Sequence, residues 1–135
     1  MNHLRRIAVI AVAAASIGAT AGCGGSDKPG YCDDRDNLEQ SVNGLKDINL
    51  SEDGVKSVQT QVQKIETDAR AFTQSAKSEF QPQSTALKSS LSALGTAVGE
   101  AVSSPSAQSL ATVADDISKV GTAFNDLADA TSQKC

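Results

Sequence analysis

The chain has 135 residues, of which 39% are hydrophobic, 3% aromatic and 21% charged, and its formal net charge is −4. This acidic balance argues against a nucleic-acid-binding protein, which needs a basic surface to displace counterions from phosphates. The sequence also lacks the several long apolar runs of a polytopic membrane protein, and its length favours a single domain.

The first 22 residues have the three parts of a secretory signal peptide. His3, Arg5 and Arg6 form a cationic start, residues 7–17 form an apolar run, and small residues follow. As a helix, this run would be about 16 Å long, roughly half the hydrocarbon thickness of a bilayer. We therefore expect residues 1–22 to be removed during export rather than to serve as a permanent anchor.

The cleavage region resembles the lipobox of bacterial lipoproteins. In that family small residues precede a cysteine that is lipidated and becomes N-terminal, and Ala21, Gly22 and Cys23 match this pattern. Thr20 stands where the family usually has an aliphatic residue. The resemblance implies a lipid on Cys23. As an alternative, residues 19–21 form an A-x-A site whose cleavage after Ala21 would release a soluble secreted protein.

Cysteine counting connects the anchor to the rest of the chain. If Cys23 carries the lipid, Cys32 and Cys135 remain as an even pair and are expected to form a disulfide in an oxidising compartment. If the protein is soluble, all three cysteines survive and one is a spare thiol. Residues 24–30 have the Gly-rich composition of a flexible tether. We therefore expect a signal peptide (1–22), a lipidated cysteine with its tether (23–31) and a folded domain (32–135).

The mature chain is more acidic than the precursor. Loss of residues 1–22 removes two arginines and the single histidine, which leaves ten basic and sixteen acidic side chains, a net charge of −6 over 113 residues. The mature protein therefore contains no histidine.

Apolar residues recur at spacings of three and four in four segments, which predicts four amphipathic helices, one short and three longer. The four stripes are Leu38, Val42, Leu45 and Ile48; Val55, Val58, Val62, Ile65, Ala69, Phe72 and Ala76; Leu87, Leu91, Leu94, Val98 and Val102; and Leu110, Val113, Ile117, Val120, Phe124 and Leu127. Near-heptad stripes of this kind pack side by side at small crossing angles. The predicted fold is an all-α, antiparallel up-down helical bundle.

Local residues predict where the first two helices begin. Asp33, Asp34 and Asp36 place negative charge at the start of the first helix, where backbone amides are unpaired. Ser51 is a predicted cap of the second helix, and the acidic residues 52 and 53 complement its dipole. Gly44 lies inside the first helix and should weaken it by roughly 1 kcal/mol.

Two prolines bear on the later helices. Pro105 after Ser104 predicts the start of the fourth helix there, because proline in the first turn costs no intrahelical bond. Pro82 either starts the third helix after a turn at Phe80 and Gln81, or kinks one continuous helix from about 52 to 102. We favour the break, since a helix of about 50 residues would extend roughly 75 Å.

The predicted topology brings the two ends of the domain together. Four helices in up-down order place the start of the first and the end of the last at the same end of the bundle, where Cys32 and Cys135 lie. A disulfide there would close a loop of 104 residues, worth on the order of 4 to 5 kcal/mol in the chain-entropy model.

The sequence offers little for catalysis. Without a histidine there is no Ser-His-Asp or Cys-His arrangement. Ser89 and Ser90 adjoin Lys88, but we interpret them as solvent-facing residues of a polar helix surface. We therefore expect no enzyme and no cofactor.

The acidic clusters lack the pattern of a metal site. Residues 33–36 and the pair Asp115 and Asp116 do not have the spacing of a calcium loop, and we assign them to a helix start and to the exposed face of the fourth helix. The paired cysteines are 103 positions apart with no histidine, which excludes a zinc site of ordinary spacing. The sequence predicts no metal.

Residues 93–99 are rich in small side chains, including Gly95 and Gly99. We favour close helix packing here, and a pocket for an apolar ligand or a surface for another helix is the alternative.

These features predict a non-catalytic binding or scaffolding module, lipid-anchored to the outer face of the cytoplasmic membrane. It would present an acidic helical surface to an envelope protein, and its other partner would be the membrane. The alternative is a carrier that opens its bundle to hold a lipid or another apolar molecule. The overall pattern resembles small secreted helical lipoproteins of high-GC Gram-positive bacteria, which implies a location in the envelope.

Overall fold

The computed structural model describes residues 28–135, apart from the side chains of Glu52 and Asp53. Within this range the chain forms four helices and no strand. They are α1 (Tyr31–Lys46), α2 (Glu52–Ala76), α3 (Gln81–Ser103) and α4 (Ala107–Thr131). The predicted all-α bundle of one short and three longer helices is therefore confirmed. The predicted signal peptide, Cys23 and residues 24–27 of the tether lie outside the described residues.

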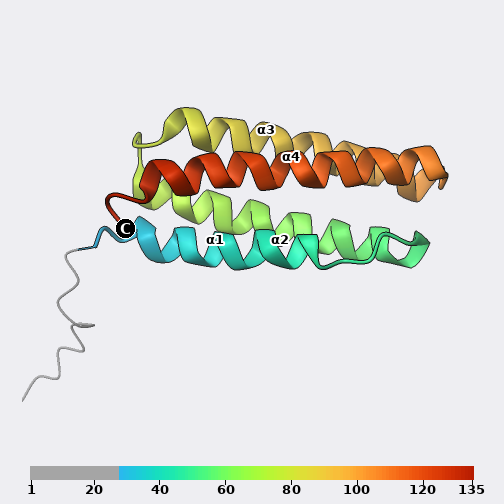
Figure 1. Ribbon diagram of the computed structural model, residues 1–135, viewed down its shortest axis with the longest axis horizontal. Helices are drawn as coiled ribbons and strands as arrows, with labels where there is room; N and C mark the ends of the chain where they lie inside the picture. The colour runs from blue at the N-terminus through green and yellow to red at the C-terminus, as the bar shows by residue number, and fades with distance from the viewer. Residues whose placement is uncertain (1–27) are drawn as a thin grey trace, which may run out of the picture.

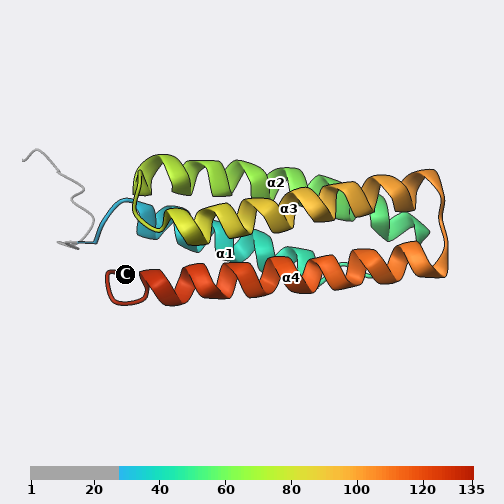
Figure 2. The ribbon, with the colours of Figure 1, turned by 90° about the horizontal axis from the view of Figure 1, so that it is seen from above.

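The helices run up and down in chain order around a square. Figure 1 shows α1 with α2 and α3 with α4 as two layers, and Figure 2 shows α2 beside α3 and α1 beside α4. The start of α1, the α2–α3 turn and the C-terminus lie at one end, which we call the tether end. The other two connections lie at the opposite, distal end. No helix among the described residues has the length and apolar character needed to cross a bilayer.

The predicted stripes form one core along the bundle axis. Leu38, Val58, Ile65 and Leu94 are examples of side chains with no exposed surface. Ile48, Ala69, Leu110 and Ile117 are only partly buried and pack against this core.

The end of the third stripe differs from the prediction. Val102 is 43% exposed, whereas Ala97 and Ala101 are buried. Two successive steps of four residues from Leu94 to Val102 exceed the 3.6-residue helical repeat, so the buried face moves on to Ala97 and Ala101.

Pro82 lies at a break between two helices. The structure has a turn at residues 77–80, and Pro82 occupies the first turn of α3, where its missing N–H costs no intrahelical bond. Phe80 adopts a left-handed conformation with φ 59°. Its ring packs against Phe72, 6.3 Å away between centroids, which fixes the reversal of the chain. The predicted break is confirmed, and the alternative of one kinked helix is wrong.

The start of α4 corrects the prediction at Ser104 and Pro105. The helix begins two residues later, with Ser106 as its cap. The Ser109 backbone N–H donates to Ser106 Oγ at 3.0 Å, and the Ser106 N–H donates to Ser109 Oγ at 2.9 Å. Counted from Ser104, the third helical position would be Ala107, whose methyl group cannot form the second hydrogen bond of a capping box. Ser104 instead ends α3, where its N–H donates to the Glu100 carbonyl.

The first two helix starts follow the prediction in part. Ser51 caps α2 by accepting a bond from the Gly54 N–H at 3.3 Å. The first turn of α1 contains Asp33 and Asp34, as expected. Asp36 lies beyond that turn and pairs with Arg35 instead. Tyr31, assigned above to the tether, is already a buried residue of α1.

Candidate functional site

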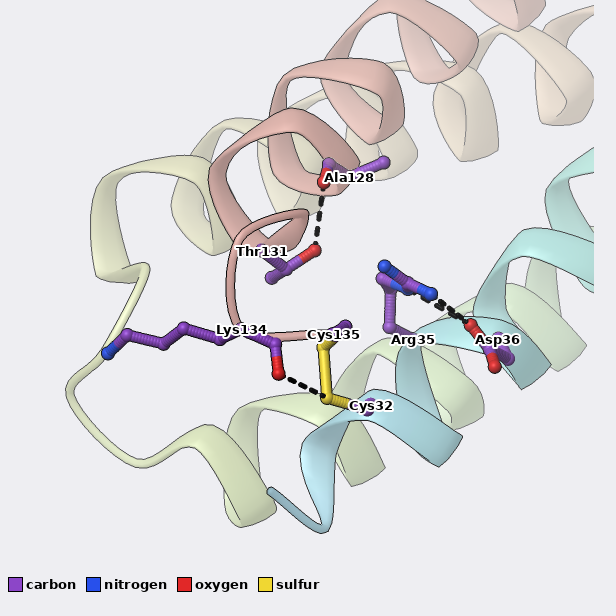
Figure 3. A network of polar contacts seen from close by, with 7 residues as sticks. All are labelled: Cys32, Arg35, Asp36, Ala128, Thr131, Lys134 and Cys135. Atoms are coloured by element: carbon purple, nitrogen blue, oxygen red, sulfur yellow. Dashed lines mark hydrogen bonds and ion pairs between the residues drawn. A yellow bond between two sulfur atoms is a disulfide. The ribbon is translucent and has the colours of Figure 1, made fainter. Parts of the chain in front are cut away.

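The tether end is closed by a disulfide between the first and last segments of the domain. Cys32, in the first turn of α1, is bonded to Cys135 with Cα atoms 5.5 Å apart, as the cysteine count predicts. Figure 3 shows this bond joining the tail after α4 to α1. The Thr131 hydroxyl donates to the Ala128 carbonyl at 3.0 Å within the last turn of α4.

The same tail is fixed to the α2–α3 turn by a lysine. Lys134 Nζ donates to Glu79 Oε1 at 2.6 Å and lies 5.8 Å from the centre of the Phe80 ring. The hydrogen bond from Lys134 lowers the pKa of Glu79 below its ordinary value, and the same bond raises the pKa of Lys134. Both side chains are about half exposed, so solvent screens this attraction.

Three aromatic rings pack on one another near the tether end. The Tyr31 ring meets Phe72 and Phe80 edge-on, with centroids 5.9 and 5.4 Å away. Burial, followed by the negative charge of Glu79, raises the pKa of Tyr31. The Tyr31 hydroxyl is buried close to the Glu79 carboxylate. Because the rings pack on one another, we assign this cluster to closing the end of the core.

The acidic pair of α4 does not lie wholly on the exposed face as predicted. Asp115 is exposed, but Asp116 is buried at 6% exposure. Asp116 comes three residues after Val113 and four before Val120, both buried, so it shares their side of the helix. Lys119 Nζ donates to Asp116 at 2.9 Å, and this bond raises the pKa of Lys119. The described part of the chain brings no three His, Cys, Asp or Glu side chains together as a metal site.

The serines near Lys88 form no catalytic arrangement in the described chain. Lys88 and Ser89 are exposed, Ser90 is partly buried, and no hydrogen bond joins the lysine to either serine within residues 28–135.

Among residues 93–99, Ala97 is buried in the core, but the two glycines are not used for close packing as predicted. Gly95 and Gly99 are exposed, and a Cβ added at either would meet no atom within 4 Å. Gly99 instead lines an open cavity of about 720 Å³ at the distal end, between the end of α3 and the start of α4. Its walls are mainly hydroxyl groups, with Glu100 as a charged residue, so it is no apolar pocket.

A second groove lies between α2 and α3 towards the tether end, with a volume of about 450 Å³. Arg70 and Lys77 on the α2 side and Lys88 on the α3 side line it, and Glu66 is a carboxylate at its margin. Three cations gather here although the domain is acidic overall. This groove is the described feature whose charge best indicates a class of ligand.

The sequence analysis missed this groove because it considered the apolar stripe of each helix by itself and did not pair residues of α2 with residues of α3. Arg70 and Lys88 lie equally far along the chain from Glu79, which is in the turn. In an antiparallel hairpin, residues equally distant from the turn lie opposite each other. Pairing basic residues about a predicted turn would have identified the site.

Comparison of the chain with protein-family models, curated proteins and solved structures finds no match. The proposals below therefore rest on the sequence and on the geometry of residues 28–135.

Proposed function

We propose that this chain is a lipid-anchored cell-envelope lipoprotein that acts as a non-catalytic binding or scaffolding module on the outer face of the cytoplasmic membrane. The observation that carries the proposal is the pairing of Cys32 with Cys135. Of the three cysteines in the sequence, this pairing leaves Cys23 for the lipid that the preceding lipobox-like residues predict.

The position of the disulfide suits a tethered domain. Residues 23–30 would span at most about 28 Å when fully extended, and they lead to the start of α1 at the tether end. An anchor at Cys23 would therefore hold the tether end close to the membrane. The distal end lies about 35 to 40 Å from the tether end, the length of a 25-residue helix.

A packed core favours recognition at the surface over carriage of an apolar molecule. Large side chains from all four helices fill the axis, and examples are Leu38, Ile65, Leu94 and Leu127. Both cavities described above open at the surface; the distal one has mainly hydroxyl walls, and three basic side chains line the α2–α3 groove. A carrier of a lipid chain would need an apolar cavity instead. Retention of a small apolar molecule, seen by native mass spectrometry of protein from the membrane fraction, would favour the carrier.

Processing in the native host tests the anchor. Globomycin, which blocks the lipoprotein signal peptidase, should cause the precursor to accumulate, and Cys23→Ala should prevent both lipid attachment and cleavage before residue 23. Ser26→Ala is the control, because it changes a nearby residue outside the predicted lipobox and leaves the disulfide between Cys32 and Cys135 intact. Unchanged maturation under globomycin and in Cys23→Ala would instead support cleavage after Ala21 and a soluble secreted protein.

A further inference from the structure

The groove between α2 and α3 places like charges across from each other. Arg70 of α2 and Lys77, the first residue after that helix, line one side, and the antiparallel register sets Lys88 of α3 at the level of Arg70. Like charges that line one groove repel each other, and a bound anion relieves this repulsion. The arrangement therefore favours a bound negative group.

The protein itself supplies little charge to balance these cations. Within residues 28–135, none of the three forms an ion pair; the pairs present there involve Arg35, Lys119 and Lys134. Glu66 lies one turn from Arg70 at the margin of the groove, so the lining has a formal charge of +2. The rest of the domain is strongly acidic, which makes this local excess of positive charge specific to the groove.

The start of α3 gives the groove polar donors. Ser84 also lines the groove, but its hydroxyl is buried. Gln81, which also lines it, is the first residue of α3, and that helix has neither a side-chain cap nor an acidic residue in its first turn. Unpaired N–H groups at a helix start attract anions. Cations and amide donors together suit an oxyanion with several acceptor oxygens.

We propose that the α2–α3 groove is a binding site for a phosphate group, with Arg70, Lys77 and Lys88 as its charged ligands. The volume of about 450 Å³ accommodates a headgroup-sized molecule. Such a phosphate is available from an anionic lipid headgroup or from a soluble phosphate ester. The proposal rests on the proposed binding role of the domain, but it does not require the anchor at Cys23.

NMR titration of the full mature chain with phosphate-containing probes tests the proposal, with the protein purified in non-ionic detergent. Glycerol 3-phosphate in solution is one probe, and short-chain phosphatidylglycerol in mixed micelles is the other, with phosphatidylcholine as the zwitterionic reference. At low ionic strength, either phosphate probe should shift the backbone amide signals of Thr73, Ser84 and Thr85. A response to glycerol 3-phosphate indicates a soluble ester, and a response to phosphatidylglycerol alone indicates the headgroup.

Charge-removing variants then assign the site. Arg70→Gln and Lys88→Gln should each weaken binding by roughly tenfold, because each removes a charge-assisted contact. Lys56→Gln and Lys64→Gln are matched controls: they remove exposed lysines of α2 outside the groove and should change the affinity less than twofold. All four positions are exposed, and circular dichroism should show equal helicity.

Two results would overturn the proposal. One is the absence of any amide signal shift with either probe, while the mass of the N-terminal peptide shows an intact lipid. That result would refute the phosphate site and leave the lipid anchor supported. The other is equal weakening in the groove variants and the controls, which would mean diffuse attraction to basic residues. An unmodified N-terminal peptide combined with specific binding in the groove would refute the anchor alone.

Discussion

Gly44 of α1 lies directly against the side-chain amide of Gln61 on α2. A Cβ added at Gly44 would be 2.8 Å from Gln61 Nε2. That nitrogen donates to the Ser41 carbonyl at 2.7 Å, one turn earlier in α1. Gly44 therefore leaves space for a hydrogen bond between two helices, a role that its low helix propensity alone does not reveal.

This contact predicts that the effect of alanine at position 44 depends on residue 61. In the wild-type background, Gly44→Ala displaces Gln61, and the lost hydrogen bond should cancel or exceed the roughly 1 kcal/mol gained in helix propensity. In a Gln61→Ala background, the same change should stabilise the protein by about 1 kcal/mol. Urea unfolding of the four variants measures this coupling.

Gly95 provides the control for this comparison of Gly44 and Gln61 variants. It is exposed in the middle of α3, and an added Cβ meets no atom. Gly95→Ala should therefore stabilise the fold by roughly 0.5 to 1 kcal/mol. Equal stabilisation by Gly44→Ala and Gly95→Ala in the wild-type background would show that the Gln61 contact has no energetic weight.

Removal of the disulfide should lower stability strongly. The bond between Cys32 and Cys135 spans 103 sequence positions, and the chain-entropy model assigns about 4.7 kcal/mol to a loop of this size. Thermal unfolding of the Cys32→Ser/Cys135→Ser double variant should show a melting temperature lower by on the order of 20 °C. A change of only a few degrees would mean that helix packing alone sets the stability.

The capping box at the start of α4 predicts an asymmetry between two neighbouring serines. Ser106→Ala removes the oxygen that accepts from the Ser109 N–H and should destabilise the protein by about 1 kcal/mol. Ser104→Ala should have little effect, because only the backbone N–H of Ser104 serves the end of α3. Chemical unfolding measures the loss of stability in each variant. A larger loss in Ser104→Ala than in Ser106→Ala would support the helix start predicted from Pro105.

Glu79 should titrate below its ordinary value of 4.5 in the native protein, because Lys134 donates a hydrogen bond to its ionised form. The unfolded chain then binds more protons in acid, so the contribution of this pair is present above about pH 4.5 and disappears as the pH falls through the lowered pKa. NMR titration of the Glu79 carboxyl carbon should show the pKa rising in Lys134→Gln. An unchanged pKa would show that the tail does not hold this contact in solution.

The fold was predictable because its main determinants are local in the sequence. Stripes such as the one containing Val58 and Ile65 specify the buried faces of helices, and the turn before Pro82 follows from backbone sterics. The burial of Asp116 was missed because two adjacent carboxylates look alike in sequence, although only one lies in phase with the stripe.

The candidate groove needed information that a single stripe does not contain. Arg70 and Lys88 become neighbours only when the position of the α2–α3 turn and the register of the two helices are fixed. Likewise, the contact between Gly44 and Gln61 depends on the packing of α1 on α2. Properties of one helix were therefore predicted more completely than relationships between two.

The mass of the N-terminal peptide from the mature protein, isolated from its native envelope, tests the central claim most directly. A lipid-anchored domain predicts a peptide that begins at Cys23 and carries the added mass of a diacylglyceryl group. An unmodified peptide that begins at Gly22 would contradict it and would establish a soluble secreted bundle.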